Sequence, residues 1–79
     1  MAEKILVTQK GCGGCEGVKK ALSEAISKGE IREVAITSDE GNRIADELDL
    51  DWVPECVEKS ADGKYTKCSL DNLIKEKGK

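Results

Sequence analysis

A pair of cysteines separated by two residues lies between a short apolar run and a segment with helical periodicity. The pair is Cys12 and Cys15, with Gly13 and Gly14 between them, and the apolar run covers residues 4–8. At the start of a helix, free backbone amides and the positive end of the helix dipole favour a thiolate over a thiol. We therefore expect Cys12 to be an attacking thiolate with a lowered pKa, and Cys15 to be the protonated, less accessible resolving thiol. The strand-then-helix context favours redox chemistry over half of a zinc knuckle, which has the same spacing.

Length and composition limit the classes of protein to which the chain can belong. Its 79 residues are expected to form a single domain, residues 1–79, with a small core. The net charge of -3, with both signs spread along the chain, argues against nucleic acid as a partner. No apolar stretch approaches the ~20 residues that span a bilayer, and the N-terminus lacks a signal-peptide core, so we expect a cytoplasmic protein without membrane association. Because the sequence contains no histidine, any catalysis must depend on cysteine.

Hydrophobic periodicity predicts the element order βαβαββα. The predicted strands are a central one in the apolar run 4–8, then residues 31–37, a strand opened by Pro54, and residues 64–68. The predicted helices are residues 15–26, a shorter one around 44–48 capped by Ser38 or Asp39, and a last one after Ser69 that buries Leu70, Leu73 and Ile74. Two parallel strands joined by a crossover, followed by a helix and a hairpin, indicate an α/β fold. We expect a four-stranded mixed sheet flanked by three helices.

These motifs resemble the thioredoxin-fold dithiol oxidoreductases, and among them the compact glutaredoxin-like proteins. The resemblance covers nearly the whole chain and rests on residues 5–15, on residues 41–54 and on residues 63–65. It implies a thioredoxin fold in which Pro54 follows a cis peptide bond and lies against the active-site cysteines. A Cys-x-x-Cys followed by Val53-Pro54 is more specific than either motif alone.

The resemblance also implies a function, namely a small dithiol–disulfide oxidoreductase that reduces protein disulfides through Cys12 and Cys15. No cofactor is expected beyond this redox-active disulfide. Candidate substrate-binding residues surround the pair and are Lys10, Gly13, Gly14, Val53 and Pro54. The expected partners are disulfide-containing proteins and an electron donor, which is either a flavoenzyme of the thioredoxin-reductase type or glutathione. We expect the protein to act as a monomer.

Two alternatives remain open from the residues. Glutaredoxins usually have a proline and an aromatic residue between the cysteines and a Gly-Gly turn before the last helix, where this chain has Gly13-Gly14 and Thr66-Lys67. Lys10 could offer a charge to a glutathione carboxylate, so a glutathione-dependent glutaredoxin ranks second to a protein-disulfide reductase. The other alternative is a cysteine-ligated metal or iron–sulfur module, either a zinc site of all four cysteines or a cluster bound through Cys12. Since the two later cysteines lack knuckle spacing, we predict no metal site.

The two later cysteines, Cys56 and Cys68, flank the predicted hairpin. If residues 61–63 form a three-residue loop with Gly63 left-handed, Cys56 faces Cys68 directly. A two-residue turn at Asp62-Gly63 would place the two on opposite faces. We expect the first arrangement, with two reduced thiols close together as a candidate secondary redox pair.

The large aromatic residues are Trp52 and Tyr65. We expect Tyr65 in the core, whereas Trp52 suits either the core or a groove beside the cysteine pair.

Overall fold

The computed structural model describes residues 3–50 and 53–77, and in it four strands form a single sheet with β1 in an internal position. The strands are β1 (Glu3–Thr8), β2 (Ile31–Ala35), β3 (Glu55–Lys59) and β4 (Tyr65–Cys68). The helices are α1 (Gly13–Ala21), α2 (Ser23–Ser27), α3 (Asp39–Leu48) and α4 (Leu70–Lys77). The sheet order is β2-β1-β3-β4, in which β1 pairs parallel with β2 and antiparallel with β3, and β4 pairs antiparallel with β3. The mixed sheet and the internal position of β1 confirm the prediction.

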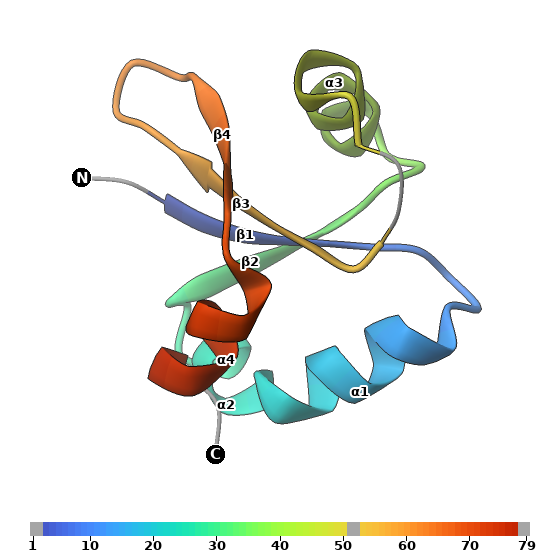
Figure 1. The fold of residues 1–79 in the computed structure, drawn as a ribbon, viewed down its shortest axis with the longest axis vertical. Helices are drawn as coiled ribbons and strands as arrows, with labels where there is room; N and C mark the ends of the chain where they lie inside the picture. The colour runs from blue at the N-terminus through green and yellow to red at the C-terminus, as the bar shows by residue number, and fades with distance from the viewer. Residues whose placement is uncertain (1–2, 51–52, 78–79) are drawn as a thin grey trace.

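The helices cover both faces of the sheet. Figure 1 shows α3 on one side and α1, α2 and α4 together on the other. Because neighbouring residues of a strand point to opposite faces, the apolar run of β1 supplies both cores, and Ile5, Leu6 and Val7 are fully buried. The core beneath α3 consists of Ile5, Val7, Val34, Ile44, Val57 and Tyr65. The core beneath the other helices consists of Leu6, Leu22, Ala25, Ile31, Cys56 and Leu73.

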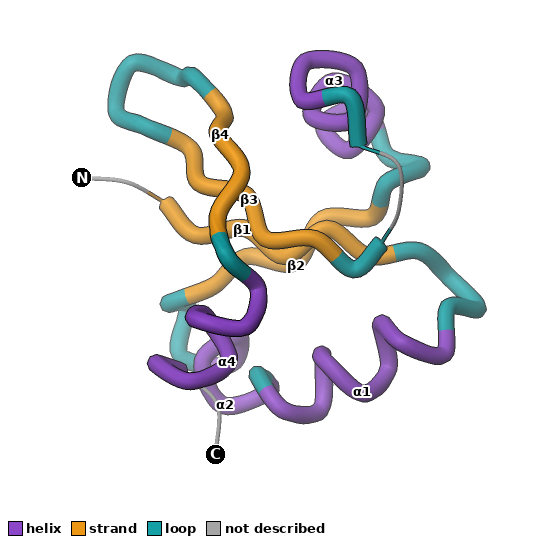
Figure 2. The backbone as a smooth tube through the Cα atoms, viewed as in Figure 1, coloured by secondary structure: helices purple, strands orange, loops and turns teal. Residues whose placement is uncertain are grey.

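The first predicted helix is two helices in the structure. The backbone at Leu22 leaves helical geometry, with φ -105° and ψ 10°, and separates α1 from α2. Figure 2 shows the short loop between them. Hydrogen bonds from Leu22 N to the Val18 carbonyl and from Ile26 N to the Leu22 carbonyl, each 2.9 Å, continue across the break. The expectation of three helices was therefore wrong, because the apolar spacing continues through Leu22 and does not reveal the interruption.

Strand β2 ends two residues earlier than predicted, at Ala35. The Ser38 hydroxyl donates to the Ala35 carbonyl at 2.6 Å and accepts from Gly41 N at 3.0 Å, so Ser38 closes a turn and caps α3 at once. Of the two predicted caps, Ser38 and Asp39, the structure therefore has Ser38, and Asp39 is the first residue of α3. A Cβ atom at Gly41 would lie 1.9 Å from the Ala35 carbonyl oxygen, so α3 begins in direct backbone contact with the end of β2.

An ion-pair network ties β2 to α3 and β4. The Arg32 guanidinium contacts both carboxylate oxygens of Glu40, at 2.5 and 2.7 Å, and also reaches Glu3 at 2.8 Å. The Tyr65 hydroxyl donates to Glu40 at 3.0 Å. These hydrogen bonds, that from Arg32 first, lower the pKa of Glu40 to about 2 against the opposing effect of burial. Tyr65 is buried, as predicted for a core residue.

The hairpin between β3 and β4 has the three-residue loop that was predicted. Ser60 N donates to the Lys64 carbonyl at 2.8 Å, and Gly63 has φ 90°. The register pairs Cys56 with Cys68, and the two are joined by a disulfide across 5.0 Å between Cα atoms. The expectation of two reduced thiols was therefore wrong. Directly opposed residues of antiparallel strands lie at a separation that a disulfide can span, so the loop length itself permits the bridge.

Candidate active site

Cys12 caps the N-terminus of α1 with its own sulfur. Its backbone is extended, with φ -83° and ψ 115°, and its Sγ accepts a hydrogen bond from Cys15 N at 3.1 Å. The turn that leads into this position is closed by a hydrogen bond from Cys12 N to the Gln9 carbonyl at 3.2 Å, and Gly11 within it has φ 82°. A glycine suits that positive φ because it has no Cβ. The sulfur thus takes the capping position that a serine or threonine oxygen usually holds.

The same geometry gives the two thiols different pKa values. The pKa of Cys12 is lowered, chiefly by its hydrogen bonds with Cys15, although partial burial and the charge of Glu16 oppose the shift. The Cys15 side chain is only 1% exposed, and burial is the main reason why its pKa is raised. Both directions agree with the sequence prediction. A thiolate forms more readily on the accessible sulfur than on the buried one.

Val53 and Pro54 lie beside this pair although they are far away in the sequence. The Cys12 thiol is positioned to donate to the Val53 carbonyl, with 3.8 Å between sulfur and oxygen. The peptide bond between Val53 and Pro54 is cis. The Pro54 ring also approaches α1, since a Cβ on Gly14 would lie 3.6 Å from its Cδ. The structure therefore brings Val53, Pro54 and Gly14 to the cysteine pair, while Trp52 lies outside the described residues.

The backbone around Cys12 is almost bare of side chains. Cβ atoms built at Gly11, Gly13 and Gly17 would meet nothing within 4 Å, so the surface there is open. Lys10 is exposed in the loop between β1 and α1. Another chain could approach the Cys12 sulfur closely along this side.

Lys19 is a further residue of interest close to the cysteine pair. It lies one turn after Cys15 on α1 and contacts Glu33 of β2 at 3.3 Å, and its charge opposes in small part the rise of the Cys15 pKa that burial causes. Glu33 also accepts from the Thr8 hydroxyl at 3.0 Å. The i,i+4 spacing from Cys15 was a visible signal for Lys19, whereas the contact with Glu33 depends on the packing of α1 against β2.

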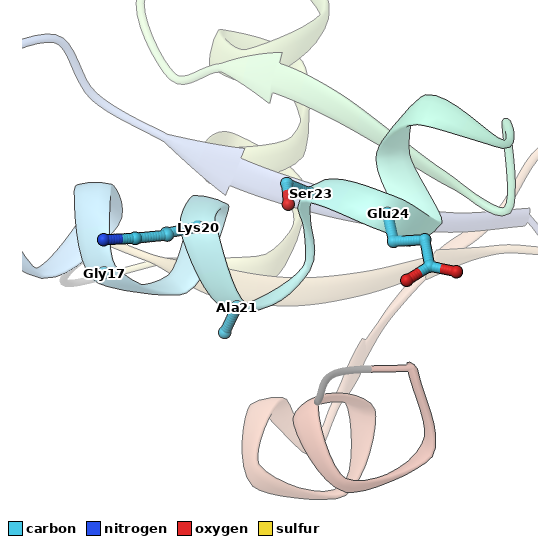
Figure 3. A pocket seen from close by; sticks show the side chains of 5 residues that line it. All are labelled: Gly17, Lys20, Ala21, Ser23 and Glu24. Atoms are coloured by element: carbon cyan, nitrogen blue, oxygen red, sulfur yellow. The ribbon is translucent and has the colours of Figure 1, made fainter.

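A shallow hollow on the outer side of α1 and α2 does not include the cysteines. Figure 3 shows its lining, in which the Lys20 side chain runs along α1 and Glu24 extends from the start of α2. Its other lining residues are Gly17, Ala21 and Ser23. The hollow therefore gives no access to Cys12 or Cys15.

One of the metal-binding alternatives, a zinc site of all four cysteines, does not fit the structure. Within 3–50 and 53–77, no cluster of three or more Cys, Asp or Glu side chains is arranged to hold a metal ion. A site of four thiolates would also need Cys56 and Cys68 as free ligands, but the two are joined in a disulfide.

Comparison with known proteins supports the fold. No protein-family model matches the chain, and no curated protein matches it. The structure is similar to the solution structure of a thioredoxin from Thermus thermophilus, with a TM-score of 0.60 and 13% sequence identity, over 95% of this chain and 69% of that one. At so low an identity the likeness concerns the fold, and the chain accordingly has an α/β thioredoxin fold. Over the described part of the chain, no helix is long and apolar enough to cross a membrane.

Proposed function

We propose that this protein is a dithiol–disulfide oxidoreductase that reduces the disulfides of other proteins through Cys12 and Cys15. The observation that carries the proposal is the asymmetry of the pair. The Cys12 sulfur caps α1 with Cys15 N at 3.1 Å, whereas the Cys15 side chain is buried. Exchange needs one nucleophilic thiolate that a substrate can reach and one nearby thiol that resolves the intermediate.

The reaction proceeds in two exchange steps. The Cys12 thiolate attacks one sulfur of the substrate disulfide, the substrate bond breaks, and the other substrate sulfur leaves as a thiolate that takes a proton. Cys15 then loses its proton, and its sulfur attacks Cys12 Sγ, which releases the first substrate sulfur. A disulfide between Cys12 and Cys15 forms, and the two electrons have passed to the substrate.

The surface around Cys12 suits an extended protein segment. The open backbone at Gly13 allows the substrate chain to approach, while Gly14 faces the Pro54 ring and the Val53 carbonyl lies beside Cys12. Lys10, exposed in the loop before α1, adds a positive charge two residues before Cys12. We assign these residues to substrate binding.

The electron donor in this proposal is a flavoenzyme of the thioredoxin-reductase type. Glutathione ranks second, since Lys10 is the one charged residue among those assigned to substrate binding that could pair with its carboxylates. The Cys12–Cys15 disulfide needs no further cofactor, and the protein acts as a cytoplasmic monomer. Measuring NADPH consumption with thioredoxin reductase, and separately with glutathione and glutathione reductase, discriminates the two donors.

Trapping of intermediates tests the assigned roles. Cys15→Ser should accumulate mixed disulfides with partner proteins, because Cys12 still attacks but nothing resolves the product. Cys12→Ser, the matched control, should trap none. Iodoacetamide labelling across a pH series, with mass mapping, should modify Cys12 first and at a lower pH than a free thiol of pKa ~8.5. Equal trapping by both variants, or faster labelling of Cys15, contradicts the proposal.

A further inference from the structure

The disulfide between Cys56 and Cys68 has its own opening to the surface. It lies on the sheet face that α4 covers, beside a hollow of about 170 Å³. This hollow is lined by both cysteines, by Lys4 of β1, and by Ser69, Asn72 and Glu76 around α4. None of the residues around Cys12 contributes to it, so a reagent can reach the bridge without passing the Cys12–Cys15 pair.

The two sulfurs of the bridge differ in accessibility. Cys56 is 0% exposed and packs in the core with Leu6 and Leu73, whereas Cys68 is half-buried at the end of β4. In thiol–disulfide exchange the incoming thiolate attacks one sulfur and the other leaves. A thiolate that enters from the hollow therefore meets Cys68, and Cys56 is the leaving group.

The hairpin does not depend on the bridge for its register. Backbone pairs at Val57 with Lys67, Glu58 with Thr66 and Lys59 with Tyr65 continue the ladder towards the turn. The loop is closed by the bond from Ser60 N to the Lys64 carbonyl. Cys56, once released as a neutral thiol, is a small apolar side chain that suits its core position. Opening the bridge therefore leaves a folded hairpin in which both sulfurs still face each other.

The hollow carries charges of both signs. Lys4, whose ammonium group pairs with Glu58, and Glu76 are both among its lining residues. The volume suits a small molecule better than a folded segment of protein. These charges complement a low-molecular-weight thiol that has both a carboxylate and an ammonium group.

We propose that Cys56 and Cys68 form a second exchange centre, at which a small zwitterionic thiol forms a mixed disulfide with Cys68. The thiolate of the small molecule attacks Cys68 Sγ, the bond to Cys56 breaks, and the Cys56 sulfur takes a proton. The reverse attack by Cys56 releases the small thiol and restores the bridge. This inference does not depend on the function proposed for Cys12 and Cys15.

The test uses the Cys12→Ser/Cys15→Ser variant, in which the bridge is the remaining disulfide. The folded variant is incubated with L-cysteine, with cysteamine, which lacks the carboxylate, or with 3-mercaptopropionate, which lacks the ammonium group. Thiolate concentrations are matched, and acid quenching and peptide mapping follow. We expect a mixed disulfide on Cys68 and a free Cys56. The rate, divided by the rate of the same thiol with the uncharged 2-hydroxyethyl disulfide to remove differences in thiolate nucleophilicity, should be about two- to fivefold higher with L-cysteine, the range that one partly exposed ion pair provides.

Lys4→Gln should abolish the preference for thiols with a carboxylate. Lys67→Gln, on the opposite face of β4, is the matched control and should leave the preference unchanged. Wild-type protein, mapped in the same way, replaces the double variant if that variant does not fold. A mixed disulfide on Cys56, a bridge that reacts only after denaturation, or equal normalised rates with the three thiols overturns the proposal.

Discussion

The bridge between Cys56 and Cys68 should make the stability of this small domain depend on redox conditions. The effect is best isolated by reducing the bridge in the Cys12→Ser/Cys15→Ser variant. Reduction removes the cross-link without changing any other side chain. The cysteines are 12 residues apart in the sequence. Closing a loop of that size in the unfolded chain corresponds to roughly 3 kcal/mol of stabilisation in the chain-entropy model.

That free energy converts into a large shift of the melting temperature. The chain has 79 residues, and an unfolding entropy of about 2.1 cal/mol/K per residue gives a fall in Tm of roughly 15–20 °C on reduction. Thermal unfolding followed by circular dichroism, with and without a phosphine reductant, measures it. Urea unfolding of the same samples gives the free-energy difference independently.

A matched control separates the cross-link from other effects of the reductant. The Cys56→Ala/Cys68→Ala variant on the same background should melt at the same temperature with and without phosphine. A reduction-induced shift below about 5 °C in the bridged protein, with thiol counting that shows full reduction, refutes the loop-closure reasoning. The same result would mean that the unfolded chain is already restricted without the bridge.

Two further predictions concern packing and pH. Gly41→Ala should lower the free energy of unfolding by about 3 kcal/mol or more, because its Cβ would lie 1.9 Å from the Ala35 carbonyl oxygen. Gly17→Ala on α1, where the Cβ meets nothing within 4 Å, should instead raise the free energy of unfolding by roughly 0.5–1 kcal/mol. Urea unfolding measures both variants, and an equal change in the free energy of unfolding for the two would contradict this explanation. Glu40→Gln should cost about 1–2 kcal/mol near neutral pH, after allowance for partial exposure of the pair with Arg32. The pKa of Glu40 is lowered to about 2 from 4.5, so the stabilisation by the Glu40 carboxylate is complete above pH ~4.5 and disappears as the pH falls through about 2. Urea unfolding measures the difference in free energy of unfolding between wild type and Glu40→Gln across that range. A difference that stays constant with pH would refute the prediction.

Much of the architecture could be read from short-range patterns. The run Ile5–Val7 predicts a strand buried on both faces, and it pairs on both sides inside the sheet. Ser38 before an amphipathic segment predicts the cap of α3, because the hydroxyl and the amide that it satisfies are only three residues apart. The break at Leu22 was missed, because apolar spacing reports which side of a helix is buried and not whether its backbone is continuous.

In the candidate site, too, some features follow from local sequence and others from tertiary packing. The chemistry of Cys12 and Cys15 follows from their spacing at a helix start, where the sulfur and the Cys15 amide must come close. The contact of Cys12 with the Val53 carbonyl joins residues that are 41 positions apart, and only the packing of α1 against the segment before β3 creates it.

The sequence by itself determined the order of the four strands, the redox-type cysteine pair and the lowered pKa of Cys12. These depend on interactions within one turn of a helix or within one strand, which local residue types control. The tertiary structure alone decided that Cys56 and Cys68 are bridged, that Cys15 is buried, and that Lys19 meets Glu33. Each of these depends on which of two loop lengths the hairpin has or on how a helix packs on the sheet. Small differences in packing free energy, summed over many distant contacts, determine which arrangement forms.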